Sequence, residues 1–357
     1  MYQLGDTMIT RRCLLKRSGR VLALAAFPSL ALPRAGTQAW EFLKEGDVIS
    51  VIAPSSPIDN PQERYAKIRA YFARTPFKVH IPDDLIEPTV PLDEANTIAK
   101  RASFVHEAFA SDAKAIWAIG GGGWGASMLR ALMRYPRPHK VKPILGYSDV
   151  TALHLYANAY LGIPSIHSVV LGINGDISPG WNHNGIDTAL ALLSGATPVV
   201  RYRFRPLNAT ARHKTAASAR IVGGNSLLVS ALNGAPGLTL DSRNAFVFLE
   251  SVADDPGRFS RKLMGLTYSA LIRDCAGVIF GDVIAQGGKE NPPAIQEQFD
   301  DIVQRFADQF AADKIVLKAD NLFGHGPVNL PLPLNTAASF HRDGPIVTGS
   351  IWANRQA

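Results

Sequence analysis

Residues 143–154 read Pro-Ile-Leu-Gly-Tyr-Ser-Asp-Val-Thr-Ala-Leu-His, and the order of elements in these residues indicates the fold class. Ile144 and Leu145 indicate a short buried strand, Gly146 a tight turn, and the residues after Ser148 have helical spacing. The same order recurs at residues 115–134, where an apolar run precedes a glycine run and a helical pattern. Short strands that alternate with helices are typical of βαβ units, so we expect an α/β fold with a parallel sheet.

The pattern extends to both sides of this stretch. A length of 357 residues suggests two domains, which we place at residues 45–171 and 216–345, with residues 172–215 as a connector. The expected strands lie near residues 46–54, 115–119, 143–146, 164–170, 219–222, 245–249, 277–280 and 315–318. The expected helices lie near residues 61–74, 97–110, 124–134, 149–161, 186–193, 226–232, 258–271 and 294–311.

The composition excludes several classes of protein. With 46% hydrophobic and 19% charged residues, the chain is neither disordered nor collagen-like, and two cysteines are too few for a disulfide scaffold. The formal net charge is +7, but residues 1–39 hold six basic residues against Asp6 and contribute +5 of it. The remaining +2 is ordinary for a globular protein, so the pI near 9.4 does not indicate a nucleic-acid partner.

Residues 1–39 have the order of an export signal. Residues 11–16, Arg-Arg-Cys-Leu-Leu-Lys, resemble the twin-arginine motif, and an apolar run at 21–32 precedes the small residues of a cleavage site at 37–39. The apolar run is too short to cross about 30 Å of hydrocarbon as a stable helix. We expect export to the periplasm by the twin-arginine route; the alternatives are an ordinary secretory signal or an uncleaved amphipathic anchor.

Residues 120–125, Gly-Gly-Gly-Gly-Trp-Gly, follow the strand expected at 115–119. Their spacing fits the dinucleotide fingerprint, but no acidic residue follows at the distance needed to hold a ribose, and the absence of Gly-Lys-Ser/Thr excludes a phosphate-binding P-loop. Backbone N–H groups in such a run can stabilise an anion, including the oxyanion of an acyl-transfer reaction. The alternative is a turn that needs positive φ angles.

Ser148 is the candidate nucleophile. The tight turn at Gly146 and the helix that follows resemble the nucleophile elbow of hydrolases, although Val150 replaces the closing glycine of the elbow. The alternative is that Ser148 or Asp149 only caps the helix.

A nucleophilic serine needs a base, and the base needs an orienting carboxylate. His325 lies between glycines just after an expected strand, and Glu250 ends the apolar strand at 245–249. A carboxylate in that position is costly unless it is paired. The alternatives are a histidine on a surface loop and a glutamate that meets solvent.

A set of short motifs is spread in order over residues 46–340. They are Gly46-Asp47-Val48-Ile49, Ala53-Pro54-Ser55-Ser56-Pro57, Gly122-Gly123-Trp124-Gly125, Gly146-Tyr147-Ser148-Asp149, Ile166-His167, Gly223-Gly224-Asn225-Ser226-Leu227, Phe248-Leu249-Glu250, Arg261-Lys262-Leu263, Phe323-Gly324-His325-Gly326 and Leu330-Pro331-Leu332. This set resembles the L,D-carboxypeptidase family of serine peptidases, which includes muramoyl-tetrapeptide carboxypeptidases and the related microcin-immunity hydrolases.

The resemblance implies an N-terminal parallel-sheet α/β domain and a C-terminal mixed α/β domain, with the active site at their interface. It makes Ser148 the nucleophile, His325 the general base and Glu250 the residue that orients the histidine. The backbone N–H groups of Gly123 and Asp149 correspond to the oxyanion hole. The implied reaction releases the terminal D-Ala from murein tetrapeptide through an acyl-enzyme on Ser148, with no metal and no cofactor.

One position departs from the family pattern. Muramoyl-tetrapeptide members usually carry Arg before the Gly-Gly-aromatic-Gly run, whereas this chain has Gly121 or Gly122 there, and the microcin-immunity branch also lacks that Arg. The alternatives are therefore hydrolysis of a peptide-nucleotide or another acylated small molecule, and a non-catalytic binder of wall peptides.

The remaining expectations concern other chemistry and partners. Because the elbow carries Ser148 and no His-Glu-x-x-His or comparable ligand cluster is present, a cysteine amidotransferase and a zinc carboxypeptidase are both disfavoured. We expect a murein peptide as substrate, no nucleic-acid partner and no stable membrane span, and the family makes a homodimer plausible.

Overall fold

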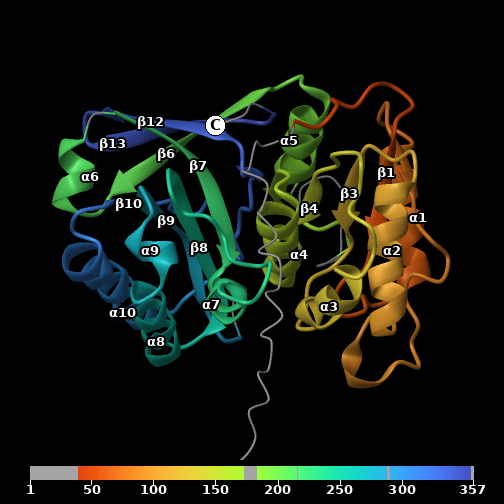
Figure 1. Ribbon diagram of the computed structural model, residues 1–357, viewed down its shortest axis with the longest axis horizontal. Coiled ribbons are helices and arrows are strands. Elements are labelled where there is room, and N and C mark those ends of the chain that lie inside the picture. The colour runs from red at the N-terminus through yellow and green to blue at the C-terminus, as the bar shows by residue number, and fades with distance from the viewer. Residues whose placement is uncertain (1–38, 173–182, 215, 288–289, 355–357) are drawn as a thin grey trace, which may run out of the picture. The chain divides into compact units, whose positions relative to one another are not determined.

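Two sheets are present in the computed structural model, which describes residues 39–172, 183–214, 216–287 and 290–354 (Figure 1). Residues 1–38, which contain the expected twin-arginine motif, lie outside the described residues. None of the helices in the described part is long and apolar enough to cross a membrane.

The first sheet has six strands in the order β11-β5-β4-β3-β1-β2, all parallel except β11. The strands are β1 (Val48–Ile52), β2 (Lys78–His80), β3 (Ala115–Ala118), β4 (Ile144–Gly146), β5 (Ser165–His167) and β11 (Leu332–Leu334). All four residues of β3 are buried, as expected for a central parallel strand that is covered on both faces. This sheet confirms the parallel α/β arrangement that the strand-turn-helix pattern predicts.

Helices join the parallel strands of the first sheet. They are α1 (Pro61–Phe72), η1 (Pro91–Asp93), α2 (Ile98–Ala110), η2 (Gly125–Met128), α3 (Leu129–Leu132), η3 (Ser148–Val150), α4 (Thr151–Leu155) and η4 (Tyr156–Leu161). In Figure 1, α1 and α2 run alongside the strands of this sheet. The helix α2 begins at the N-cap Thr97, whose side chain accepts a hydrogen bond from the backbone N–H of Lys100.

The second sheet closes into a barrel in the order β10-β6-β13-β12-β7-β8-β9. Its strands are β6 (Val199–Pro206), β7 (Ala216–Asn225), β8 (Ala245–Asp254), β9 (Gly277–Ala285), β10 (Ile315–Lys318), β12 (Ala337–Asp343) and β13 (Ile346–Trp352). The neighbours from β7 through β8 and β9 to β10 are parallel and the other pairs are antiparallel, which makes this half of the fold mixed, as expected.

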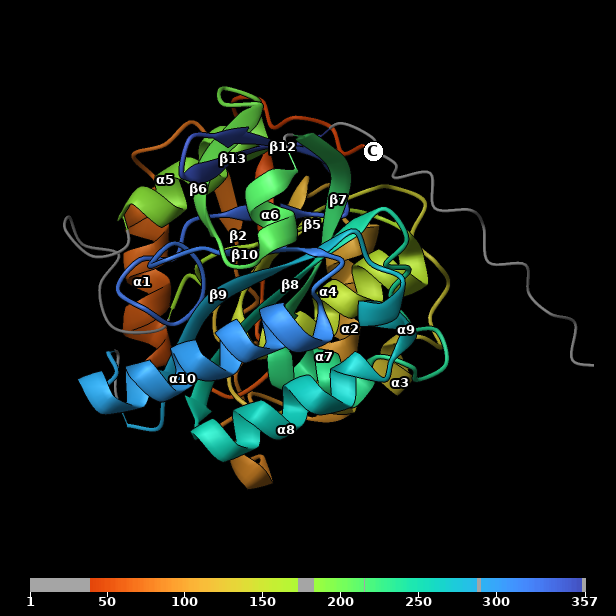
Figure 2. The same cartoon turned by 90° about the vertical axis from the view of Figure 1, so that its left-hand side faces the viewer.

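Helices accompany the barrel strands. They are α6 (Ala209–His213), α7 (Ser226–Leu232), α8 (Pro256–Thr267), α9 (Ala270–Arg273), α10 (Pro293–Arg305) and η5 (Phe306–Phe310). Figure 2 shows α8 and α10 next to each other, and Phe259 of α8 meets Phe299 of α10 edge-on with ring centroids 5.6 Å apart.

Residues 172–215, interpreted from the sequence as a connector, contribute the helix α5 (His183–Ser194) and the barrel strand β6. In β6 the buried residues Val200, Tyr202 and Phe204 alternate with exposed arginines. This period of two is typical of a strand with one solvated face. The pattern could have indicated β6 from the sequence, but the basic residues of the segment favoured the interpretation as a connector.

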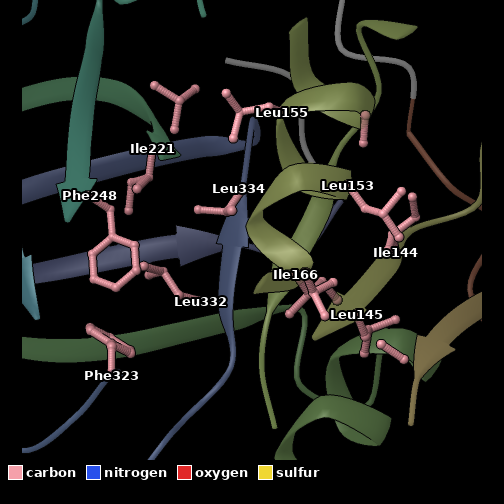
Figure 3. Packing of buried hydrophobic residues seen from close by; sticks show 14 of the residues in the cluster. Ile144, Leu145, Leu153, Leu155, Ile166, Ile221, Phe248, Phe323, Leu332 and Leu334 are labelled. Atoms are coloured by element: carbon pink, nitrogen blue, oxygen red, sulfur yellow. The ribbon is translucent and has the colours of Figure 1, made fainter. Parts of the chain in front are cut away.

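The strand β11 follows the barrel strand β10 in the chain but pairs with β5 of the first sheet. Figure 3 shows Leu332 and Leu334 of β11 among Ile221 and Phe248 of the barrel on one side and Ile166 of β5 on the other. A single hydrophobic core therefore connects the two sheets.

Candidate active site

Ser148 is the first residue of η3, two residues after the end of β4, and is half-buried. Its φ angle is 61°, a left-handed conformation that residues other than glycine rarely adopt. Gly146 has a φ of 153°, and a Cβ atom there would meet the side chain of Val150 at 2.8 Å. The structure thus contains the strained strand-turn-helix geometry of a nucleophile elbow.

The glycine run at residues 120–125, here called the glycine loop, passes beside Ser148. A Cβ atom on Gly121 would lie 3.1 Å from Cβ and 3.3 Å from Oγ of Ser148. Gly122 has a φ of 129°, as the turn alternative predicts for part of the run, whereas Gly123 is exposed and has nothing within 4 Å of its Cβ position. The loop therefore combines a constrained backbone with an open position next to the candidate nucleophile.

The carboxylate of Asp149 connects the elbow to the glycine loop. Asp149 is buried, and its Oδ2 atom accepts hydrogen bonds from Oγ of Ser55, at 2.6 Å, and from the backbone N–H of Gly125. Gly123 and Asp149, the two positions that the family resemblance implies for an oxyanion hole, therefore belong to segments joined by one buried carboxylate.

His325 and Glu250 form a direct pair. Nδ1 of His325 lies 2.8 Å from Oε2 of Glu250, and the glutamate side chain is completely buried, whereas 14% of the histidine side chain is exposed. Glu250 does not meet solvent at the end of a strand, because β8 continues to Asp254 with a register shift between Leu249 and Ser251. The buried glutamate is thus paired with the histidine, and the solvent-exposed alternative is wrong.

The environment keeps Glu250 ionised. Burial opposes the charged form, but the charge and hydrogen bond of His325 and the hydrogen bond from the amide of Asn225 hold the pKa of Glu250 below its usual value. An ionised carboxylate on Nδ1 of an imidazole leaves Nε2 as the nitrogen that can accept a proton.

Tyr147 brings the nucleophile segment to the histidine. The ring of Tyr147, the residue before Ser148, lies against the imidazole of His325 with centroids 4.7 Å apart. The structure therefore brings the elbow, the glycine loop and the Glu250–His325 pair into one region, although these residues are far apart in the sequence.

Asn225 is a site residue to which the sequence analysis gave no role. Its Nδ2 donates to Oε1 of Glu250 at 3.1 Å, and its backbone N–H donates to Oγ1 of Thr151 at 2.8 Å. Thr151 begins α4, the helix after the elbow, so Asn225 links the carboxylate to the nucleophile side of the site. Gly224 allows this approach, since a Cβ atom there would lie 2.6 Å from Oγ1 of Thr151.

His167 is a second residue without an assigned role, although it stands in one of the quoted motifs. It is completely buried on β5, opposite Gly146 in the parallel register, and its ring meets Phe248 edge-on at 5.0 Å. Within the described residues, neither ring nitrogen has a hydrogen-bond partner. Burial lowers the pKa of His167 to about 3, so the ring is neutral at ordinary pH.

Asp282 lies beside the turn that carries His325, where it would meet Cβ atoms on Gly324 and Gly326. Its Oδ1 accepts the backbone N–H of Asn321 at 3.2 Å. Burial raises the pKa of Asp282 to about 6, and the charge of Glu250 adds to the increase, while Lys318 and the N–H of Asn321 oppose it.

Other reactive groups lie elsewhere or are not clustered. Among the residues that the structure describes, no three His, Cys, Asp or Glu side chains are grouped so that they could hold a metal ion. Cys275 is buried, with Sγ donating to the carbonyl of Ile272, and burial raises its pKa to about 11, which makes it a poor nucleophile.

Two family models match the chain. The LD-carboxypeptidase N-terminal domain matches residues 49–168, and the LD-carboxypeptidase C-terminal domain matches residues 218–340. The first matched region carries Ser148 and the glycine loop, and the second carries Glu250 and His325.

Curated relatives agree with these matches. A protein of Rickettsia conorii that bears the name of a carboxypeptidase is 30% identical over 62% of this chain and 66% of its own length. A Bacillus subtilis protein named as a probable murein peptide carboxypeptidase is 26% identical over 67% of this chain and 73% of its own length. The chain thus spans just under two thirds of the Rickettsia relative.

Solved structures share the fold. The muramoyltetrapeptide carboxypeptidase of Oxalobacter formigenes aligns with a TM-score of 0.69 and 16% identity, over 87% of this chain and 100% of its own. The MccF-like protein of Bacillus anthracis aligns with a TM-score of 0.71 and 20% identity, over 87% of this chain and 98% of its own. MccF in complex with glutamyl sulfamoyl guanosine aligns with a TM-score of 0.69 and 17% identity, over 91% of this chain and 100% of its own.

Proposed function

The chain belongs to the LD-carboxypeptidase family, and from this premise we propose that it is a serine carboxypeptidase that releases the terminal D-Ala of murein tetrapeptide. The observation that carries the proposal is the buried Glu250–His325 pair beside an elbow whose serine has a positive φ angle. A surface histidine or a simple helix cap would need neither the buried carboxylate nor the strained serine.

The proposed reaction proceeds in two steps. Oγ of Ser148 attacks the carbonyl carbon of the bond between the L-centre of the diamino acid and the terminal D-Ala, and Nε2 of His325 takes the hydroxyl proton. The C–N bond then breaks, His325 returns the proton to the leaving amine, and an acyl-enzyme on Ser148 remains. Water activated by His325 hydrolyses the ester and restores the serine.

The negative charge on the carbonyl oxygen needs donors during both steps. We assign this role to the backbone N–H groups of Gly123 and Asp149, whose segments are joined through the Asp149 carboxylate. Removal of one such donor in other enzymes costs about 10²–10³ in rate. Glu250 holds the imidazole and stabilises its protonated form between the proton transfers.

The substitution Ser148→Ala tests this mechanism. We expect it to abolish the release of D-Ala from murein tetrapeptide, measured by mass analysis of the fragments, while the unfolding transition stays near that of the wild type. Wild-type turnover should resist a chelator and should be blocked by a serine-directed phosphonate. Release by Ser148→Ala at the wild-type rate would overturn the proposal.

A second substrate class is favoured by one sequence feature and one comparison. The glycine loop has no Arg before its Gly-Gly-Trp-Gly segment, and the fold aligns with MccF bound to glutamyl sulfamoyl guanosine. Incubation with tetrapeptide and with an aminoacyl sulfamoyl nucleoside in parallel distinguishes the two candidates. Saturable binding without product from either compound would instead support a wall-peptide binder.

We also propose that the protein acts in the periplasm after twin-arginine export, on the basis of residues 11–16. Replacement of both arginines by lysine should keep the protein in the cytoplasm, as measured by cell fractionation. Unchanged export would show that another route is used.

A further inference from the structure

Arg101 is a completely buried arginine that the proposed mechanism does not use. It lies in the first turn of α2 with 1% of its surface exposed. A cation at this end of a helix is disfavoured by the helix dipole, and a buried charge is costly unless it is paired and hydrogen-bonded. Local helix stability therefore does not explain why an arginine occupies this position.

The contacts of Arg101 converge on the glycine loop. Nη1 donates to the carbonyl of Trp124 at 2.8 Å, directly after Gly123, and Nη2 donates to Oγ of Ser127 at 2.9 Å. Ser127 in turn donates to the carbonyl of Trp124 at 2.7 Å. The guanidinium thus contacts the glycine loop at its C-terminal end.

The same guanidinium binds two neighbouring segments. Nη1 donates to the carbonyl of Pro54 at 2.7 Å, Nε donates to the carbonyl of Asn96 at 2.9 Å, and Nη2 forms an ion pair with Glu94 at 2.8 Å. The segment at Pro54 continues to Ser56, whose N–H donates to the carbonyl of Gly121 at 3.0 Å. The planar fork of arginine can satisfy all these acceptors at once, which an ammonium group cannot do.

We infer that Arg101 is a positioning residue for the oxyanion hole: with Glu94, it holds the glycine loop so that the N–H of Gly123 stays aimed at the substrate oxygen. The part of this inference that concerns catalysis rests on the proposed function. Oxyanion donors act mainly in the transition state, so loss of their alignment lowers kcat more than it raises KM.

The substitution Arg101→Lys keeps the charge and removes the fork. We expect faster amide hydrogen exchange in residues 119–127, measured by mass spectrometry, and a kcat at least tenfold lower with KM within threefold of the wild type. The matched control is Lys142→Met. Lys142 is another buried cation against α2, but its Nζ donates to the carbonyls of Ala108 and Ser111 at the far end of that helix.

The control should lower the melting temperature yet leave loop exchange and kcat unchanged. The inference is overturned if Arg101→Lys leaves the exchange or kcat at the wild-type value. Should Arg101→Lys fail to fold, the milder Ser127→Ala, at an exposed position, decides: a two- to tenfold loss of kcat with faster loop exchange supports the inference, and wild-type values overturn it.

Failure of the proposed function is recognised separately. If the wild type releases no D-Ala, the rate at which a phosphonate labels Ser148 replaces kcat in the same comparison, since that reaction also develops charge on an oxygen in the hole. Slower labelling of Arg101→Lys then supports the inference although the substrate assignment is wrong. A wild type that neither turns over nor reacts with phosphonate overturns both.

Discussion

Glu250 has no exposed surface, and its ionised form is maintained by two donors, His325 and Asn225. Buried carboxylates that are fixed in this way orient an imidazole. They also stabilise the protonated imidazole that forms in the transition state, so their main effect is on kcat. The φ angle of Ser148 is also energetically unfavourable, and the surrounding structure maintains it, which fixes the direction of the serine side chain.

The first prediction at the scale of the residue concerns Glu250→Gln. The amide preserves the shape but donates toward Nδ1 of His325, which favours the wrong tautomer, so we expect kcat to fall by about 10³–10⁴ with little change in KM. Steady-state kinetics together with thermal unfolding measure both effects. A kcat within tenfold of the wild type, in a folded variant, would contradict the assigned role.

The second prediction concerns His167 and pH. In the unfolded chain the imidazole titrates near 6.5, whereas in the folded protein its pKa is about 3, so below pH 6.5 the unfolded state binds a proton that the folded state does not. The stabilising contribution of the neutral ring is therefore complete above pH 6.5 and is lost as the pH falls toward 3.

The substitution His167→Phe removes this dependence. Between pH 6.5 and 5 we expect the free energy of unfolding of the wild type to fall by about 2 kcal/mol more than that of the variant. Urea unfolding at the two pH values measures the difference. The same change in the free energy of unfolding between the two pH values for both proteins would show that His167 is protonated in the folded state.

At the scale of the element, the glycine loop acts as one constrained unit. Its carbonyl at Gly121 accepts from Ser56, its N–H at Gly125 donates to Asp149, and its carbonyl at Trp124 accepts from Arg101. Fixed backbone dipoles of this kind do not need to reorganise when charge develops on a substrate.

The matched pair Gly122→Ala and Gly123→Ala tests this constraint. Gly122 has a φ of 129°, and its Cβ would lie 2.9 Å from the backbone nitrogen of Ser56, so we expect a loss of about 1–3 kcal/mol in stability and a lower kcat. Gly123 has open space at its Cβ position, and we expect its unfolding free energy to change by less than about 0.5 kcal/mol. Equal stabilities in urea unfolding would contradict the structural distinction.

At the scale of the whole molecule, β11 joins the two halves of the site. The proposed nucleophile, Ser148, lies after β4 of the first sheet, whereas Glu250 belongs to the barrel, and Leu332 and Leu334 of β11 pack between elements of both (Figure 3). Under the proposed mechanism, the geometry of the site is therefore expected to depend on a hydrophobic contact that contains none of the proposed catalytic groups.

The substitution Leu334→Ala should cost about 2–5 kcal/mol of stability and also lower kcat, because the cavity lets the barrel side of the site shift. Leu263→Ala is the control: it removes an equally buried leucine from α8, and we expect a similar loss of stability with kcat unchanged. Chemical unfolding and kinetics below the unfolding temperature separate the two effects. The same kcat for both variants would show that packing of β11 has no specific effect on the geometry of the site.

The local elements around the proposed nucleophile, Ser148, could be predicted from the sequence. Alternating buried strands and helices predicted the parallel sheet, and the apolar-glycine-serine order predicted the elbow at Ser148, because hydrophobic period and turn chemistry are local properties. The strand β6 was interpreted as part of a connector, because arginines occupy the exposed positions of its period-two pattern and make the segment look polar. It also ended β8 at Glu250, since a carboxylate in a strand is favourable only when a distant partner is present.

Which distant groups meet could not be predicted from the sequence and follows from the tertiary structure. From the residues alone, His325 was one of nine histidines, and nothing in the spacing of 75 residues from Glu250 indicates a contact of 2.8 Å. The contacts of Asn225 and Arg101 and the burial of His167 also became visible only in the fold, because burial and hydrogen bonding are properties of the packed chain. Features that depend on local backbone geometry, such as the turn at Ser148, can be predicted from neighbouring residues. Contacts between buried side chains depend on how distant segments pack, so they are seen only where the two sheets share one hydrophobic core.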